Sequence, residues 1–395
     1  MLKNKDIRYK IISKNIIKAI NNLKNKKYTP LHEPNLDNND IKAVSECLKS
    51  TFVSSISKFT ETFEKKIKHL TKANYSIAVI NGTAALQIAI KTLRIKKDDE
   101  ILIPNLNYIA SSNAAIYCGS IPHYVDVDIE NFGIDTNKLR KYLSKICIIK
   151  KNYSINRKTK RVIKAIIPTH VFGNSSNIKE IVKIAKKYRL KVIEDASECV
   201  GSYFDKKHLG TFGDIGVLSF NGNKTITTGG GGALLINNKK NYYRALDLST
   251  ISRKINSGWS YDYSEVGYNY RLPGINSSLG ISQIKKLPLI LKKKRKIFLR
   301  YKKFFESDNE IKLVSEPSRT QSNHWLNTIY IKNSNFNLRD KILETVNKTG
   351  IAIRPVWKLM HKINHLSNYP KMDIKNSIHL EKSLLNIPSS PNLYD

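Results

Sequence analysis

The sequence is poor in cysteine and has no long apolar run, and these shortages exclude several classes of protein. Its 395 residues include four cysteines, Cys47, Cys118, Cys147 and Cys199, without CxxC spacing. Disulfide-rich secreted domains and zinc fingers both need closely spaced cysteines, so we expect buried thiols in the reducing cytoplasm. No stretch approaches the roughly 18 apolar residues of a transmembrane helix, and the basic N-terminus lacks the apolar core of a signal peptide. We therefore expect no membrane association.

Acidic side chains are also scarce. The 32 Asp and Glu residues face 68 Lys and Arg residues, which gives a net charge of +36. Such a charge favours nonspecific association with nucleic acid. The basic residues are, however, spread along the chain, with the densest runs at 3–27, 145–161 and 285–303, and no zinc-finger, RNP or basic-aromatic motif accompanies them. We interpret the charge as solvated surface, and nucleic-acid binding is the alternative.

Strands and helices alternate along the first two thirds of the chain. Apolar strands are expected at 75–80, 100–104, 121–127, 162–168, 191–194, 215–220 and 233–236. Helices are expected between most of them, and the polar segment 145–161 is expected to form an exposed loop or hairpin. Repeated strand–helix–strand units predict an α/β fold with a largely parallel sheet covered by helices on both faces.

The pattern changes after residue 255. A long basic helix at 283–305, strands at 328–331 and 351–354, and a helix at 339–348 predict a smaller C-terminal α/β domain. We divide the chain into a basic helical extension at 1–29, with its helix over 8–24, a large domain at 30–255 and a small domain at 256–395.

The stretch GVLSFNGNKTITTGGGGA at 216–233 combines a hydroxyl, an amine and four glycines. Ser219 ends an apolar strand, Lys224 follows in a polar turn, and the glycines occupy 229–232. In parallel sheets, ligands bind beyond the carboxyl ends of the strands. Other distinctive residues also follow predicted strands: Gly82 and Thr83, Tyr108, His170, and Asp195.

Each of these residues offers one part of a cofactor site. The segment NGTAAL at 81–86 leads from a strand into a helix, whose first amides and dipole favour a phosphate, although an ordinary N-cap is the alternative. Glu194 and Asp195 point to opposite sides of their strand, so one of them can face the site and keep a ring nitrogen protonated. The alternative roles for this carboxylate are a helix cap or a metal ligand. Because no histidine cluster accompanies it, we expect no metal.

The lysine supplies the chemistry that the other residues lack. Lys224 can form a Schiff base with a carbonyl compound. Ser219 provides a second phosphate contact, and Tyr108 an aromatic face for stacking. An acid for a ring nitrogen, an aromatic face, a phosphate cradle and a Schiff-base lysine together indicate a site for pyridoxal 5'-phosphate.

Four segments, NGTAALQIAI, EDASE, SFNGNKTITTGGGGAL and GYNYRLPGINSSLG, resemble the DegT–DnrJ–StrS family of sugar-nucleotide aminotransferases. The resemblance runs from about residue 28 to the C-terminus. It implies the aspartate-aminotransferase-like fold (fold type I of pyridoxal-phosphate enzymes) and a homodimer with shared active sites. The segments PLHEP, RPVWKLMHK and NIPSSPNL resemble the subgroup that aminates a UDP-linked 4-keto-6-deoxy-N-acetylhexosamine for legionaminic acid or bacillosamine-type sugars.

The resemblance assigns a role to each matching residue. It implies that Lys224 binds the cofactor covalently, that Asp195 pairs with the pyridinium nitrogen, and that Glu198 lies near the phenolic oxygen, where relatives often have Gln. The implied phosphate contacts are Gly82, Thr83, Ala84 and Ser219, with Tyr108 stacking on the ring and Asn269 reaching the phosphate from the other subunit. Family members with histidine in place of the lysine are dehydratases, so Lys224 favours amino transfer.

The predicted reaction moves an amino group from L-glutamate, leaving 2-oxoglutarate, to a nucleotide-linked keto sugar, UDP being the expected nucleotide. Amination at C3, another pyridoxal-phosphate reaction on a nucleotide sugar, and a regulator without turnover are the alternatives. Candidate substrate contacts are His32, His170, Arg271, His324, Arg354 and Trp357. For the histidines, Arg354 and Trp357, the alternative is a structural role in packing or hydrogen bonding.

Overall fold

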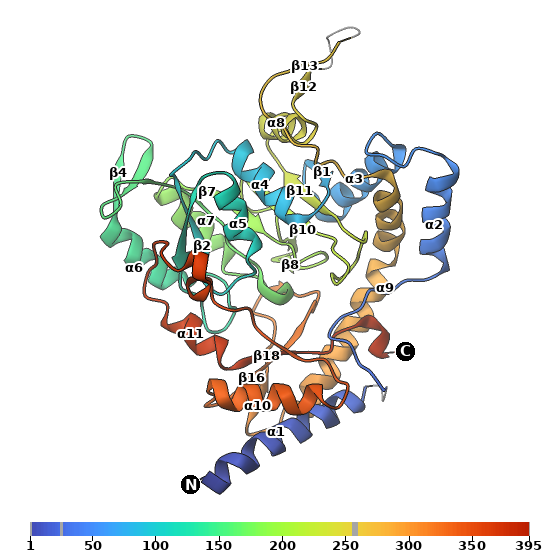
Figure 1. The fold of residues 1–395 in the computed structure, drawn as a ribbon, viewed down its shortest axis with the longest axis vertical. Coiled ribbons are helices and arrows are strands. Elements are labelled where there is room, and N and C mark those ends of the chain that lie inside the picture. Colours follow the sequence, from blue (N-terminus) through green and yellow to red (C-terminus); the bar gives the residue numbers. More distant parts are fainter. Residues whose placement is uncertain (1, 24–26, 255–259, 395) are drawn as a thin grey trace.

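The computed structural model describes residues 2–23, 27–254 and 260–394 (Figure 1). The expected end of the N-terminal helix at residue 24 and the expected domain boundary at 255/256 lie outside these ranges. Within the described ranges, every helix is too short or too polar to cross a lipid bilayer.

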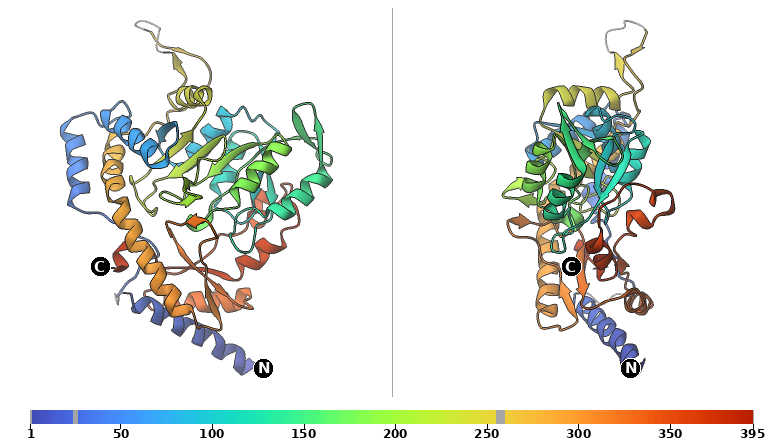
Figure 2. Two further views of the ribbon diagram at one scale, coloured as in Figure 1. Left: turned by 180° about the vertical axis from the view of Figure 1, so that it is seen from behind. Right: turned by 90° about the vertical axis from the view of Figure 1, so that its left-hand side faces the viewer.

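A nine-stranded sheet forms the body of the molecule (Figures 1 and 2). Its main path is β1 (Tyr75–Val79), β11 (Gly232–Ile236), β10 (Ile215–Ser219), β7 (Lys191–Asp195), β6 (Val162–Ile166), β2 (Glu100–Pro104) and β3 (Ile121–Val125). From β10 to β3 the neighbours are parallel, whereas β11 runs antiparallel to both β1 and β10. The strands β1, β10 and β7 therefore end at the same edge of the sheet.

The basic insertion forms a hairpin, one of its two expected structures. Its strands are β4 (Cys147–Lys150) and β5 (Tyr153–Asn156), and β5 pairs antiparallel with the start of β6. The predicted class, an α/β fold with a mostly parallel sheet, is confirmed.

Helices cover both faces of this sheet. One face carries α4 (Gly82–Thr92), α5 (Ala110–Tyr117) and α8 (Lys239–Ser249), which pack on alternate strand residues such as Ile77 and Val79. The other face carries α3 (Lys58–Thr71), α6 (Thr136–Ile146), α7 (Ile178–Lys187) and part of α9 (Gly274–Phe305), which pack on the intervening residues. Because both faces are covered, β2, β10 and β11 are buried along their whole length, as is typical of such sheets.

A second, antiparallel sheet lies below the first in Figure 1. Its order is β14 (Ile311–Leu313), β16 (Asn327–Ile331), β18 (Leu384–Ile387) and β17 (Arg354–Pro355). The end of α9, α10 (Phe336–Asn347) and α1 (Leu2–Asn21) share one core with it. Ile12, Ile16 and Ile20 of α1 are fully buried there, and each buried isoleucine contributes roughly 1.5–3 kcal/mol. The N-terminal helix is thus packed into this layer.

Several expected boundaries are wrong, and several elements were not anticipated. Helix α1 begins at Leu2, not at residue 8. Helix α9 begins at Gly274, not at 283, because Pro273 provides its N-cap and small residues continue the first turns. The strand expected at 351–354 is limited to β17, while Ile351 makes an isolated bridge with Thr29. The helix α2 (Asn38–Lys49) precedes α3 in the chain. The elements that were not anticipated are β8 (Tyr203–Phe204), β9 (Lys207–His208), β12 (Arg253–Lys254), β13 (Asp262–Tyr263), β15 (Thr320–Gln321), α11 (Lys375–Glu381) and four short 3₁₀ turns at 171–173, 360–362, 364–366 and 391–394.

Candidate active site

The loop between β1 and α4 lies against the ends of β10 and β7. A Cβ atom added to Gly82 would lie 3.3 Å from both Ser197 Oγ and Ser219 Cβ, so these three residues line one small space. The side chain of Asn81 caps α4 by accepting the Ala84 N–H at 2.8 Å. The amides of Gly82 and Thr83, in the first turn, have no intrahelical acceptor. Backbone donors and serine hydroxyls therefore converge where the helix dipole favours an anion.

The glycines after Lys224 shape the backbone. Gly229 has a φ of +80°, which a side chain rarely tolerates. A Cβ on Gly232 would lie 2.6 Å from the backbone of Asn81, so this glycine lets β11 approach the loop before α4.

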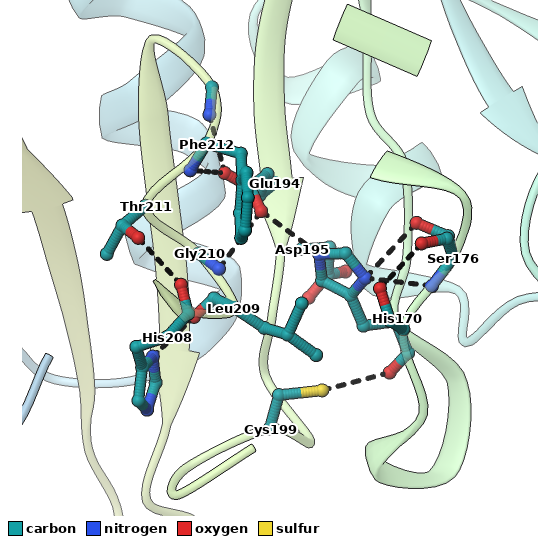
Figure 3. A network of polar contacts seen from close by, with 12 residues as sticks. His170, Ser176, Glu194, Asp195, Cys199, His208, Leu209, Gly210, Thr211 and Phe212 are labelled. Atoms are coloured by element: carbon teal, nitrogen blue, oxygen red, sulfur yellow. Dashed lines mark hydrogen bonds and ion pairs between the residues drawn. The ribbon is translucent and has the colours of Figure 1, made fainter. Parts of the chain in front are cut away.

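The two carboxylates at the end of β7 point to opposite sides, as predicted. Glu194 accepts the N–H groups of Gly210 (3.0 Å), Gly213 (2.5 Å) and Phe212, and its Oε2 lies 3.1 Å from His170 Nε2. Figure 3 shows His170 between Glu194 and Ser176. The N–H and the hydroxyl of Ser176 lie 3.2 and 3.1 Å from His170 Nδ1. The protein itself therefore satisfies Glu194 and both ring nitrogens of His170.

Asp195 is buried, 5% exposed, but has fewer partners. Its Oδ2 accepts the Ser111 hydroxyl at 2.9 Å, and its Oδ1 accepts the Ser197 N–H at 3.2 Å. Two carboxylate oxygens offer about four acceptor positions, so Asp195 has capacity for a further donor.

Lys224 and Glu198 form the centre of the site. Lys224 Nζ lies 3.5 Å from Glu198 Oε1 and 3.8 Å from the centre of the Trp325 indole ring. Glu198 Oε2 accepts the N–H of Phe172 at 2.7 Å. Burial raises the pKa of Glu198 to about 7, although the Lys224 charge and the Phe172 N–H lower it. Glu198 is therefore poised to take up or release a proton near neutral pH.

Tyr108 and Asn269, two other predicted cofactor residues, have more exposed side chains. Tyr108 follows β2 and is 57% exposed. Asn269 is exposed and lies on a segment that runs beside β1, where the Tyr270 carbonyl accepts the Ile80 N–H at 2.9 Å. Arg271, on the same segment, pairs with Glu64 at 2.8 Å. That ion pair holds the guanidinium of Arg271 beside β1.

The remaining candidate substrate residues differ in how firmly the protein engages them. His324 accepts from Arg295 at 3.0 Å, and its ring stacks on Phe298; burial and the Arg295 charge lower its pKa to about 3. The exposed Arg354 bonds to Asn347 at 3.1 Å. The Trp357 ring centre lies 5.0 Å from that of Phe172, which connects it to the Trp325 side of the site. His32 contacts Lys294.

Three residues of the site are absent from the sequence prediction: Ser111, Ser197 and Trp325. Ser111 and Ser197 hold Asp195, and Trp325 covers one side of the Lys224 amine. Ser197 lies inside the quoted EDASE segment, so its hydroxyl was a detectable signal. Ser111 and Trp325 carry no motif that distinguishes them.

The arrangement fits pyridoxal phosphate. Asp195 has open acceptor positions for a protonated ring nitrogen, Lys224 supplies an amine, and the space at Gly82 is small and lined by donors. In the described part of the chain, no group of three or more His, Cys, Asp or Glu residues is arranged to hold a metal ion.

Comparisons with known proteins agree with this fit. The model of the DegT/DnrJ/EryC1/StrS aminotransferase family matches residues 34–395. GDP-perosamine synthase of Escherichia coli O157:H7 is 33% identical over 93% of this chain and 94% of its own length. UDP-4-amino-4,6-dideoxy-N-acetyl-beta-L-altrosamine transaminase of Campylobacter jejuni subsp. jejuni serotype O:23/36 is 29% identical over 90% of each chain.

Among solved structures, Helicobacter pylori PseC, an aminotransferase involved in the biosynthesis of pseudoaminic acid, shares the fold. Its TM-score is 0.83 at 24% identity, covering 92% of this chain and 94% of that chain. The family match spans nearly the whole chain and includes Asp195, Lys224 and the loop at Gly82. The protein therefore belongs to the DegT/DnrJ/EryC1/StrS aminotransferase family, which includes sugar aminotransferases that depend on pyridoxal phosphate.

Proposed function

We propose that the protein transfers an amino group from L-glutamate to C4 of a nucleotide-linked 4-keto-6-deoxy sugar, in the cytoplasm and for a surface glycan. The observation that carries this proposal is the placement of Asp195, Lys224 and the Gly82 loop around one edge of the sheet. A UDP-linked N-acetylhexosamine on the way to a legionaminic acid or bacillosamine-type sugar is the first substrate to test. A GDP-linked sugar is the second, because the names of the two relatives above contain UDP and GDP.

Asp195 would hold the ring nitrogen of the cofactor. Pyridoxal phosphate, when bound, supplies an electron-accepting ring. The carboxylate of Asp195 favours the protonated nitrogen through a charge-assisted hydrogen bond. Ser111 and Ser197 fix the two carboxylate oxygens, so the remaining acceptor positions keep a defined direction.

Lys224 would move the proton at the α-carbon of the amino donor. Its amine is restrained by the Trp325 ring on one side and by Glu198 on the other, and it is 13% exposed. A general base takes up the proton and later returns it to the reacting group. Glu198, whose pKa burial raises to about 7, can exchange a proton with Lys224 without bulk water.

The phosphate would bind at Gly82, Thr83, Ala84 and Ser219, and the ring would stack on Tyr108. We propose that a second copy of the chain supplies Asn269 to complete this site, so the homodimer is the active form. The exposed side chain of Asn269, beside the strand that leads to Gly82, is consistent with such a contact. We treat 30–255 as the large domain and 256–395 as the small domain of each subunit.

Formation of 2-oxoglutarate from L-glutamate tests the reaction. The protein is incubated with L-glutamate and a panel of UDP- and GDP-linked 4-keto-6-deoxy sugars, and NMR of the product distinguishes amination at C4 from amination at C3. Lys224→Ala should abolish turnover and the visible absorbance of the bound cofactor that borohydride removes. Lys68→Ala, on the exposed side of α3, is the matched control and should retain both. Normal turnover by Lys224→Ala would refute the mechanism.

A further inference from the structure

The loop at 322–326, which leads into β16 of the second sheet, places Trp325 over the amine of Lys224. Lys224 Nζ lies 3.8 Å from the centre of the indole ring, so it lies above the face of the ring and not at its edge. Trp325 is 5% exposed, and the Lys224 side chain is 13% exposed. The ring therefore shields the amine from solvent on this side.

The orientation of the ring is fixed next to Lys224 itself. The indole N–H of Trp325 donates to the carbonyl of Asn223, the residue before Lys224, at 2.7 Å. This N–H is the only donor of the side chain, and a turned ring would leave it without this acceptor. The ring and the lysine therefore share one anchor in the chain.

Asn323 fastens the same loop to both members of the pair that Lys224 forms with Glu198. It is 1% exposed, and its Nδ2 lies 2.8 Å from the Glu198 carbonyl oxygen and 3.1 Å from the hydroxyl of Thr225. Thr225 directly follows Lys224 in the chain. The N–H of Trp325 donates to Asn323 Oδ1 at 2.9 Å. The ring is therefore held at a set place relative to both Lys224 and Glu198.

The face of the ring attracts the amine in both of its protonation states. An ammonium is attracted by the negative face of an aromatic ring, and tryptophan gives the strongest such interaction. A neutral amine can still donate an N–H to the same face. A general base passes through both states, because it takes up a proton and later returns it. The contact with Trp325 therefore persists through the proton transfer.

We propose that Trp325 is a positioning residue, which acts through Lys224 by holding its amine in place while the proton is taken up and returned. Without the ring, the flexible lysine side chain can turn the amine away from the α-carbon of the amino donor and from Glu198. The proton transfer itself rests on the proposed function, whereas the position of the amine can be measured without any reaction.

NMR of the cofactor-free protein, labelled with carbon-13 at Cε of lysine, tests the position of the amine. The signal that disappears in Lys224→Arg identifies Lys224. Because an aromatic ring shields protons above its face, the Hε signal of Lys224 should lie upfield of those of exposed lysines. Trp325→Leu should abolish this shift, and Trp325→Phe, which keeps an aromatic face, should retain part of it. A wild-type Lys224 signal among those of exposed lysines would overturn the proposal.

Single turnover of the holoenzyme at saturating L-glutamate tests the effect on proton transfer. The loss of the visible absorbance of the bound cofactor follows the reaction, and L-glutamate deuterated at the α-carbon gives the isotope effect. Trp325→Leu should slow the reaction by about 10- to 100-fold, as expected for a misplaced reacting group. Its isotope effect should not fall below that of the wild type, because proton transfer is the step that slows.

Two further variants separate positioning from packing. Trp325→Phe should recover most of the rate, because the aromatic face is retained. Phe305→Leu removes a ring, 4% exposed, from the core beside the second sheet and should leave the rate and the isotope effect unchanged.

Two kinetic outcomes would overturn the proposal. One is an isotope effect that falls toward one in Trp325→Leu, which would mean that a step other than proton transfer has slowed. The other is a Trp325→Phe variant that is as slow as Trp325→Leu. A wild-type holoenzyme that does not react with L-glutamate would refute the proposed function, and the NMR shift in the cofactor-free protein would still decide whether Trp325 holds the amine.

Discussion

Glu194 and Asp195 are adjacent in the chain, yet the two sides of β7 treat their carboxylates differently. Glu194 has four partners, three backbone N–H groups and His170, which fill its acceptor positions. Asp195 has two partners, the Ser111 hydroxyl and the Ser197 N–H. Both are buried. The difference separates a carboxylate that holds the fold together from one that is available to a ligand.

The number of hydrogen-bond partners also separates the rings of His170 and His32. His170 uses both ring nitrogens within the protein, one toward Glu194 and the other toward Ser176. His32 uses only Nε2, and its Nδ1 is without a partner. Both were candidate substrate contacts, and by this criterion His32 is the stronger one.

The largest effect is expected on the Asp195 side. Asp195→Ala removes the proposed acceptor for the ring nitrogen and should lower kcat/KM by roughly 10²- to 10⁴-fold, the range for a positioned catalytic group. The midpoint of thermal unfolding of the cofactor-free protein should change little, because few hydrogen bonds are lost. Steady-state kinetics and calorimetry measure the two quantities. A variant that unfolds easily but retains activity would reverse the assignment of the two carboxylates.

In contrast to the substitution of Asp195, substitution of Glu194 should lower the stability of the protein. Glu194→Ala leaves three buried N–H groups and His170 without their acceptor, which should lower the apparent free energy of unfolding by about 3–5 kcal/mol. Urea denaturation followed by circular dichroism measures this loss. Glu194→Gln, which retains one acceptor oxygen, should lose less. A change below about 1 kcal/mol in Glu194→Ala would show that the network around it contributes little.

Much of this comparison follows from sequence periodicity. Alternation along a strand predicted that Glu194 and Asp195 face opposite sides, and the parallel order predicted that Gly82, Asp195 and Ser219 meet at one edge. Periodicity cannot count the partners of each carboxylate, because those partners come from distant segments. Ser111 reaches Asp195 across 84 positions of the chain.

The burial of Lys294 was missed for a related reason. Lys294 is the last of three consecutive lysines in a strongly basic helix, and composition does not distinguish a buried lysine from exposed ones. Its place on the helix does, because Ile290, Ile297 and Tyr301 share its buried face at helical spacing. A charged residue within an apolar stripe is a signal that the sequence contained.

Glu198 should make the stability of the cofactor-free protein depend on pH. Its folded pKa is about 7, against an ordinary value of 4.5. Its protonated form therefore contributes stability that is complete below pH 4.5 and is lost as the pH rises through about 7. Relative to Glu198→Gln, which cannot ionise, the wild type should lose roughly 3 kcal/mol between pH 4.5 and pH 8.

Urea denaturation at intervals across that range measures the effect of Glu198. The difference between the two proteins should be flat above pH 8, where both the folded and the unfolded carboxyl are ionised. Parallel curves at every pH would show that folding does not raise the pKa of Glu198, and its proposed exchange of a proton with Lys224 would then fail.

The smallest effect is expected at the Gly82 loop, where a methyl group tests whether the space beside Asp195 is reserved for a ligand. In Gly82→Ala the new Cβ would lie 3.3 Å from Ser197 Oγ and Ser219 Cβ, contacts that small shifts can relieve. The free energy of unfolding should therefore change by less than about 1 kcal/mol, whereas cofactor affinity should fall about tenfold, as expected for roughly 1.4 kcal/mol of lost binding. Gly222→Ala is the matched control, because its Cβ would meet only the Gly229 carbonyl, at 3.8 Å. Equal cofactor affinity in the two variants, measured by fluorescence titration, would mean that the phosphate lies elsewhere.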